Sequence, residues 1–467
     1  MARHRLVALV AAIAALAALG SQAWSPARLG AQGAPATPQV TPTAPPSQAP
    51  STGTGRDVWG VITQGGTKKL NIAIPDFAVV AGADPGGTAR LLATVAGTDL
   101  NFTGQFSAVS GTAAIPAGNT VALEQAWKDF AAAGAHAALH GLLGVRPDRL
   151  EVEVRLYDLT ASPPRLIVTR KFELPADQAR RLAHKVADEV VLQFTGEPGV
   201  ADTKVAFVAG RAGAAKEIQI VDYDGAGPRS VTRNGSINLT PAWSPDARSL
   251  AFTSYKNGYP DLFRAFPFER RPDQTLAAFI GINSSPSWSP DIKNVAMTLS
   301  KDGNPDIYVL TLTTGNFRRL TRHAGIDTDP SWSPNGREIA FVSDREGQPH
   351  VFVMDAEGAN VRRVTSGGHQ TQPRWSPRGD TIVFTMRQGT HDLWAINADG
   401  SNVRRLTAGP ADNQGPSWAP DGRHLVFQSN RLGPWQLFVM FPDGSEQTPI
   451  TRGVEERTSP SWSPRLP

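Results

Sequence analysis

Two groups of residues in this chain have types and spacing that could perform chemistry, and the first is a pair of histidines. His136 and His140 stand four residues apart, as zinc-binding histidines do on a helix when a glutamate follows the first of them. Here Ala137 follows His136, so that pattern is absent. In a strand the two imidazoles would share one partly solvated face, and we predict no metal site.

Other enzyme signatures are also missing from the sequence. The chain has no Cys, no Gly-x-Ser-x-Gly elbow, no Gly-Lys dipeptide of a P-loop and no Gly-x-Gly-x-x-Gly. The run from Asp222 to Gly225 is a turn and not an EF-hand, because the downstream calcium ligands are lacking. These observations exclude thiolate chemistry, a serine hydrolase domain and nucleotide cofactors, and we predict no cofactor.

The second group consists of polar side chains that precede a recurring Pro-x-Trp-x-Pro motif. They are Asn238; Asn283 and Ser284; Asp327, Thr328 and Asp329; Gln370, Thr371 and Gln372; Asn413 and Gln414; and Glu455, Arg457 and Thr458. Amides and hydroxyls suit hydrogen bonding better than acid–base work, and no two of these loops offer an evident carboxylate pair. We predict that they converge on one binding mouth for a peptide or small ligand; the alternative is a set of merely solvated loops.

The elements that would position these loops follow from the period of the motif. Its tryptophans are Trp243, Trp288, Trp332, Trp375, Trp418 and Trp462, spaced 45, 44, 43, 43 and 44 residues apart. After five of the copies a turn and two clear strands follow, and then a turn and a fourth strand. Four short strands in about 44 residues are the period of a propeller blade. We predict an all-β six-bladed propeller over residues 199–467, with the tryptophans packed between blades.

The ends of the repeat region indicate how the ring closes. Lys204–Val208, Glu217–Asp222 and Arg229–Thr232 supply three strands without a motif before them, and the last motif, Pro460–Pro464, lies almost at the end of the chain. We therefore predict that the C-terminal motif strand completes the first blade.

Residues 57–198 predict a separate α/β domain. Lys69–Ile74 is a buried strand, and Leu150–Tyr157 alternates apolar and charged residues as a half-buried strand that pairs with Arg165–Phe172. Gly87–Leu100, Ala122–Ala133 and Ala176–Phe194 carry apolar residues at helical spacing. Strands mixed with helices over this length favour one compact α/β domain.

The first 56 residues predict a targeting segment followed by a linker. Arg3 and Arg5 precede the apolar run Leu6–Leu19, and a small-x-small exit ends at Ala23. This order is typical of a signal peptide, residues 1–23, cleaved after about Ala23; an uncleaved anchor is the alternative. Residues 24–56 are rich in Pro, Ala and Thr and predict a disordered linker, either a spacer or a partner-binding arm.

Composition limits the possible partners. The net charge of +4 with 19% charged and 40% hydrophobic residues gives no case for nucleic acid or membrane insertion. We expect an exported monomer.

Ordered motifs make the chain resemble the TolB family, the periplasmic propellers of the Tol–Pal cell-envelope system. In the α/β region the resemblance rests on Leu70–Phe77, Thr103–Phe106, Arg155–Asp158, Ala183–Asp188 and Thr195-Gly196, with further matches at Asp99-Leu100, Trp127-Lys128 and Gly134-Ala135; Thr203–Val208 opens the propeller. In the propeller it rests on the six tryptophan motifs.

The resemblance implies a non-enzymatic periplasmic scaffold. Proteins of this family bind the peptidoglycan-associated lipoprotein Pal at the channel mouth and TolA through an N-terminal arm, and support outer-membrane integrity and cell division. Carried over by position, Pal contacts fall on Asp327–Asp329, Gln370–Gln372, Asn413 and Gln414, with neighbours at Asn238, Asn283 and Arg457. The long proline-rich arm departs from the family. The alternative is a propeller hydrolase or lyase that acts on a glycan or peptide in the channel.

Overall fold

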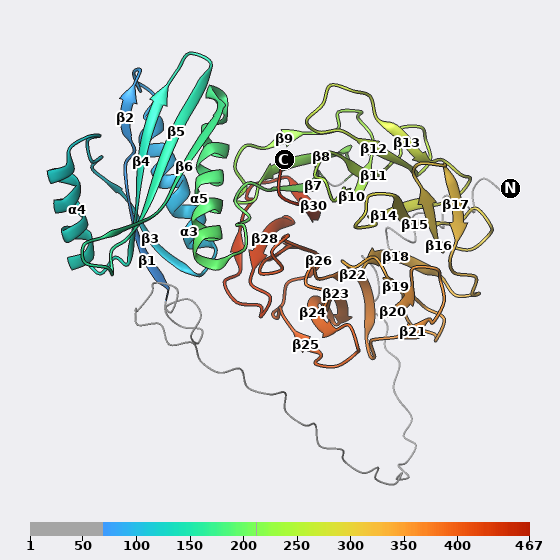
Figure 1. The fold of residues 1–467 in the computed structure, drawn as a ribbon. Helices are drawn as coiled ribbons and strands as arrows, with labels where there is room; N and C mark the ends of the chain where they lie inside the picture. The colour runs from blue at the N-terminus through green and yellow to red at the C-terminus, as the bar shows by residue number, and fades with distance from the viewer. Residues whose placement is uncertain (1–68, 212) are drawn as a thin grey trace, which may run out of the picture. The chain divides into compact units, whose positions relative to one another are not determined.

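The computed structural model describes residues 69–211 and 213–467. The signal peptide and the linker predicted for residues 1–56 lie outside this range. All of the described residues belong to one compact unit. Within the described part, an α/β region precedes a ring of six small sheets (Figure 1).

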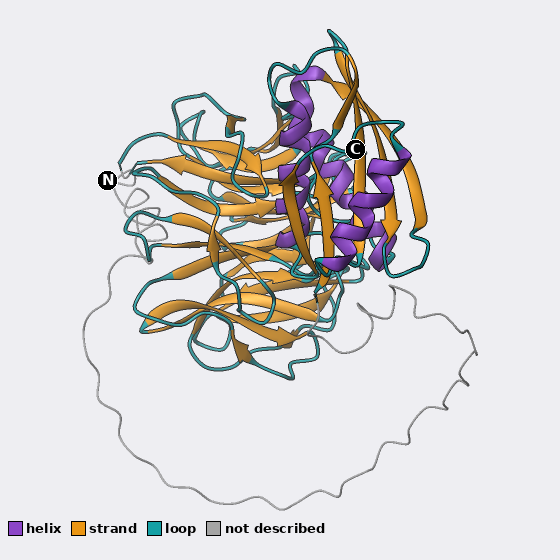
Figure 2. Cartoon of the chain, turned by 90° about the vertical axis from the view of Figure 1, so that its left-hand side faces the viewer, coloured by secondary structure: helices purple, strands orange, loops and turns teal. Residues whose placement is uncertain are grey.

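The α/β region is a mixed six-stranded sheet with helices packed against it (Figure 2). Its elements are β1 (Leu70–Pro75), β2 (Ala78–Ala81), α3 (Thr88–Phe102), β3 (Phe106–Thr112), α4 (Thr120–Ala132), β4 (Ala137–Val145), β5 (Arg149–Asp158), β6 (Arg165–Pro175), a 3-10 turn (Ala176–Gln178) and α5 (Ala179–Thr195). The strand order is β3-β1-β4-β5-β6, with β2 beside β4. β1 runs parallel to β3 and β4, whereas β4, β5 and β6 are antiparallel.

The local patterns explain these elements. β5 buries every second residue, as its alternation predicts. α5 buries Leu182, Val186 and Val190 on the face turned toward α3. It ends at Thr195, and the following Gly196, with a φ of 76°, supplies the left-handed cap. The α/β class predicted for this region is therefore confirmed. The boundaries of 57 and 198 stay a prediction.

The remaining strands form six four-stranded antiparallel blades around a channel (Figure 1). The blades are β10 (Asn238–Trp243), β11 (Leu250–Ser254), β12 (Asp261–Ala265) and β13 (Gln274–Ala277); β14 (Asn283–Trp288), β15 (Asn294–Leu299), β16 (Asp306–Thr311) and β17 (Asn316–Arg319); β18 (Asp327–Trp332), β19 (Glu338–Ser343), β20 (His350–Asp355) and β21 (Arg362–Arg363); β22 (His369–Trp375), β23 (Thr381–Gln388), β24 (Thr390–Asn397) and β25 (Arg404–Arg405); β26 (Asn413–Trp418), β27 (Leu425–Ser429), β28 (Gln436–Met440) and β29 (Thr448–Pro449); and β30 (Glu456–Trp462) with β7 (Lys204–Gly210), β8 (Lys216–Asp222) and β9 (Arg229–Ser230). We call β10, β14, β18, β22, β26 and β30, which end at the motif tryptophans, the motif strands.

The ring closes as the repeat pattern predicts. β30, the last strand of the chain, pairs antiparallel with β7, from Glu456 opposite Gly210 to Trp462 opposite Val205. The blade that opens the propeller is therefore completed by the C-terminal strand. The six-bladed architecture is confirmed.

The motif tryptophans pack between blades. Trp288 joins a core cluster with Ala251 and Leu262 of the preceding blade, and Trp375 does the same with Ala340 and Val351. Each indole thus fills the space between two sheets, which is the structural role that the sequence predicted for it.

Hydrogen bonds from backbone N–H groups to serine hydroxyls link the motif strands around the ring. Where the residue before the tryptophan is serine, its Oγ accepts the backbone N–H of the next blade's tryptophan. The pairs are Trp332 with Ser287 (3.2 Å), Trp375 with Ser331 (3.0 Å), Trp462 with Ser417 (2.9 Å) and Trp243 with Ser461 (3.3 Å). The last pair joins β30 to β10 and so completes the circle of motif strands.

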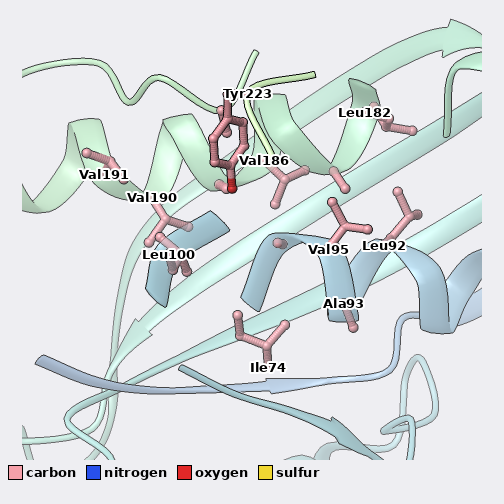
Figure 3. Packing of buried hydrophobic residues seen from close by; sticks show 14 of the residues in the cluster. Ile74, Leu92, Ala93, Val95, Leu100, Leu182, Val186, Val190, Val191 and Tyr223 are labelled. Atoms are coloured by element: carbon pink, nitrogen blue, oxygen red, sulfur yellow. The ribbon is translucent and has the colours of Figure 1, made fainter. Parts of the chain in front are cut away.

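A buried charge cluster joins the α/β region to the propeller. His184 of α5 lies 2.7 Å from Asp99 of α3 and 3.5 Å from Asp222 of β8. Tyr223 donates to Asp99 at 2.6 Å, and Lys204 binds Asp222. Figure 3 shows Tyr223, which belongs to the propeller, beside the apolar side chains that α3 and α5 pack together.

Opposite charges raise the pKa of His184. Burial by itself would lower it, but the Asp222 and Asp99 carboxylates outweigh burial and bring the pKa to about 9. Burial by itself would raise the pKa of Asp222, but His184 and Lys204 hold it well below its usual range. His184 is therefore a cation at neutral pH and ties three segments of the chain together.

Candidate functional site

The motif strands begin at one end of the channel, and we call this end the channel mouth. Among the polar residues predicted from the sequence that are the first or second residues of these strands, five are buried. They are Asn238, Asn283, Asp327, Gln370 and Asn413, and each is at most 1% exposed. Their side chains lie inside the blades.

Each buried side chain holds its own loop. Asp327 accepts two hydrogen bonds from Arg345 Nη2, both at 3.0 Å. Asn413 donates to Asp392 at 3.1 Å and accepts from Arg431 at 2.6 Å. Buried polar groups must be paired in this way.

This burial corrects part of the site predicted from the sequence. Asn238, Asn283, Asp327, Gln370 and Asn413 are unavailable to a partner in this structure, because they are buried and hydrogen-bonded to their own or the preceding blade. The remaining residues are partly exposed, namely Ser284, Thr328, Asp329, Thr371, Gln372, Gln414, Arg457 and Thr458. A binding role for them stays a prediction.

Asp329 and Gln372 occupy a special backbone position. Together with Thr240, Ser285, Gly415 and Ser459, they directly precede the motif prolines and have φ between 49° and 62°. Ser285 Oγ donates to Asp329 at 2.7 Å, and Gln372 accepts from the backbone N–H of Gly415 at 3.0 Å. Contacts with neighbouring blades therefore hold both side chains in place.

Exposed apolar side chains surround the mouth, and the sequence analysis missed them. Ile237, Ile280, Ile326 and Val454 lie one to three residues before motif strands, and Ile280 is 93% exposed. Tyr259 and Leu432 lie in loops after the second strands, which reach the same end because Asn238 pairs with Ser254 and Asn413 with Ser429. Six of the nine exposed large apolar residues in the described propeller thus gather at this end.

The α/β region contacts the opposite end. His424 lies in the turn after Trp418, and its Nε2 is 3.2 Å from the backbone oxygen of Phe102. Arg378 and Arg423, also beyond the ends of motif strands, each lie 3.4 Å from Glu197. These contacts leave the mouth uncovered by the α/β region.

A channel cavity of about 390 Å³ extends from Thr240 and Ser285 to the Ser-Pro turns after the tryptophans. All six motif tryptophans line it, and Arg374 is the single ionisable side chain among its lining residues. No acid–base pair is present there.

The histidine pair has ordinary structural partners. His136 Nδ1 accepts the backbone N–H of Asn71 at 3.0 Å, and His140 Nε2 lies 3.2 Å from the Ile115 oxygen. Across residues 69–211 and 213–467, no group of three or more metal-ligating side chains is close enough to hold an ion. No helix in that range is long and apolar enough to span a bilayer.

The fold defines a class of protein: a six-bladed β-propeller that carries an amino-terminal α/β domain. The family model described as the TolB beta propeller domain matches residues 191–390 and 368–466, and the model described as the TolB amino-terminal domain matches residues 61–164. Since the propeller model covers more than half of the chain, the chain belongs to the TolB family.

Individual proteins of this family also match the chain in sequence. The chain is 37% identical over 266 residues to the Tol-Pal system protein TolB of Desulfosudis oleivorans, a match covering 54% of this chain and 58% of the relative. It is 36% identical over 205 residues to that of Cereibacter sphaeroides, covering 43% and 46%. The chain therefore spans about half the length of these curated relatives.

A solved structure covers more of the molecule. The crystal structure of TolB from Acinetobacter baumannii matches 85% of this chain and 97% of its own, with a TM-score of 0.72 and 28% identity. The match includes both the α/β region and the propeller.

Proposed function

We propose that the protein is a non-enzymatic periplasmic scaffold of the Tol–Pal system. It binds a Pal-like lipoprotein at the channel mouth and a TolA-like inner-membrane protein through its N-terminal region, and so supports outer-membrane integrity and cell division. The observation that carries this proposal is the cluster of exposed apolar residues at the mouth. Contiguous exposed apolar surface marks protein interaction sites.

The mouth combines the features of an interface. Ile280, Val454 and Tyr259 supply apolar area, at 93%, 75% and 67% exposure. Asp329 and Gln372 supply polar groups that neighbouring blades hold in place. Apolar anchors among ordered hydrogen-bonding groups are typical of protein interfaces.

The hydrolase or lyase alternative lacks support. Either reaction needs a general acid or base near the substrate. Thr, Ser, Pro, Ala and Trp line the channel cavity together with Arg374, and an arginine does not exchange protons near neutral pH.

The mouth can be tested by calorimetry with a purified Pal-like domain. We expect a 1:1 complex that Ile280→Asp weakens about tenfold or more, since a charge at an apolar anchor loses its burial. The double variant Asp329→Ala with Gln372→Ala is expected to weaken it as well. The matched control is Val361→Asp, because Val361 is exposed at the opposite end of its blade. Equal affinity for all of these variants contradicts the proposed site.

The N-terminal region needs its own test. A chain without residues 24–56 is expected to keep its affinity for the Pal-like domain and to lose binding to the periplasmic part of a TolA-like protein. Both affinities are measured with the same preparation by calorimetry. Retained TolA-like binding would make this segment a spacer.

A further inference from the structure

One blade departs from the others inside the channel. The residue between the motif proline and tryptophan is Ala242, Ser287, Ser331, Ser417 or Ser461 in five blades, and Arg374 in the sixth. Arg374 lines the channel cavity. A large cation thus stands where the other blades carry a methyl or hydroxyl group.

The Arg374 guanidinium has no carboxylate in contact. Its Nη1 donates to the backbone oxygen of Pro373 at 2.8 Å, and no described residue forms an ion pair with it. The opposing charge that acts on it, Asp329, already accepts a hydrogen bond from Ser285. Burial lowers the pKa of Arg374, and Asp329 opposes this only in part. The Arg374 side chain is partly buried. A partly buried cation without a contacting anion loses some of its hydration, and an anionic ligand would offset that loss.

Hydroxyl donors share the same cavity. Ser287, Ser417 and Ser461 line it, and the Oγ of each accepts a backbone N–H from the next blade. A hydroxyl carries one donor besides its acceptor lone pairs. No side-chain or backbone acceptor within the described residues takes these three protons.

We propose that the propeller channel contains a carboxylate-binding site, formed by the guanidinium of Arg374 and the hydroxyls of Ser287, Ser417 and Ser461. The planar guanidinium matches the two oxygens of a carboxylate, and a single cation balances a single negative charge. The cavity of about 390 Å³, walled by prolines and tryptophans, also accepts the apolar atoms next to the carboxylate. Arg374 directly precedes Trp375, at the end of its motif strand away from the mouth.

Two sources of a carboxylate are possible, the side chain of a peptide and a free small acid, and one experiment separates them. The probes are N-acetylglutamine amide, N-acetylglutamate amide and acetate, titrated into the full chain at constant ionic strength. Because six of the eleven tryptophans line the channel, tryptophan fluorescence reports binding there. We expect saturable binding of N-acetylglutamate amide and none of its neutral glutamine analogue. Saturation by acetate alone would identify a free small acid as the ligand.

Substitution of Arg374 supplies the decisive comparison. Arg374→Met is expected to weaken carboxylate binding about tenfold or more, since a charge-assisted hydrogen bond is lost. Arg374→Lys is expected to retain part of the binding. The control Arg404→Met removes an arginine from β25, the outer strand of the same blade. This substitution should leave the affinity for the carboxylate unchanged.

Melting curves without ligand complete the test. Arg374→Met should melt at or above the temperature of the unsubstituted chain, because it removes a partly buried charge that has no contacting carboxylate. Unchanged carboxylate affinity in Arg374→Met, or equal affinity for the glutamate and glutamine probes, overturns the proposal.

Discussion

A chain that ends at Gly453 is expected not to form a folded propeller. It lacks β30 (Glu456–Trp462), which is the innermost strand of the blade that β7 begins. The truncation opens the edge of β7, removes the buried Trp462, and takes away the Ser461 Oγ that accepts the Trp243 N–H. A ring of blades has no free edges only when it is closed. We therefore expect both neighbouring blades to lose their folded structure as well. Near-ultraviolet circular dichroism measures the loss of tertiary structure, and urea unfolding measures the loss of stability.

A synthetic peptide of residues Glu455–Pro467 provides the control for the truncation. Added in trans, it should restore a cooperative unfolding transition, and a scrambled peptide of the same composition should not. A truncated chain that unfolds at the same urea concentration as the full chain would contradict the closure argument.

His184→Ala is expected to destabilise the protein by about 3–5 kcal/mol, the usual cost of removing one partner from a buried ion pair. The substitution leaves Asp99 buried with only the Tyr223 hydroxyl as a side-chain partner, and it removes one cation from Asp222. Urea unfolding followed by tryptophan fluorescence measures the change.

The same histidine predicts a pH dependence. Its folded pKa of about 9 lies above the ordinary histidine value of about 6.5. The stabilisation is therefore fully present below about pH 6.5 and is lost as the pH rises through 9. A shift of this size corresponds to about 3 kcal/mol. The decline between pH 7 and 10 should be smaller in His184→Ala by this amount.

His391→Ala is the matched control for both measurements. His391 lies 3.0 Å from Asp412, but the two side chains are 17% and 33% exposed. Solvent screens such a pair, so we expect a loss below about 1 kcal/mol. Equal destabilisation by both histidine variants would contradict the claim that burial makes the His184 cluster strongly stabilising.

The mouth shows where sequence reasoning succeeds and where it stops. The motif spacing correctly placed six loops at one end of the channel. It could not tell that Asp327 faces Arg345 inside its blade whereas Asp329, two residues later, stays partly exposed. A bulge between Thr328 and Ser331 changes the register there, and a register change alters the face to which side chains point.

Arg374 illustrates a signal that was present and not used. The residue before each motif tryptophan is readable in the sequence, and an arginine among alanine and serines is a visible departure. The exposed Ile280 and Val454 gave no comparable signal, because exposure depends on which surfaces the neighbouring blades cover.

The sequence by itself determined the number of blades, the strand that closes the ring and the α/β domain before it. These follow from patterns that repeat over short distances, since strand period and turn chemistry are local. Only the tertiary structure decided which polar loop residues are buried, which apolar residues surround the mouth, and that His184 lies between Asp99 and Asp222. Those relations join segments far apart in the chain, and burial and charge pairing depend on how such segments pack.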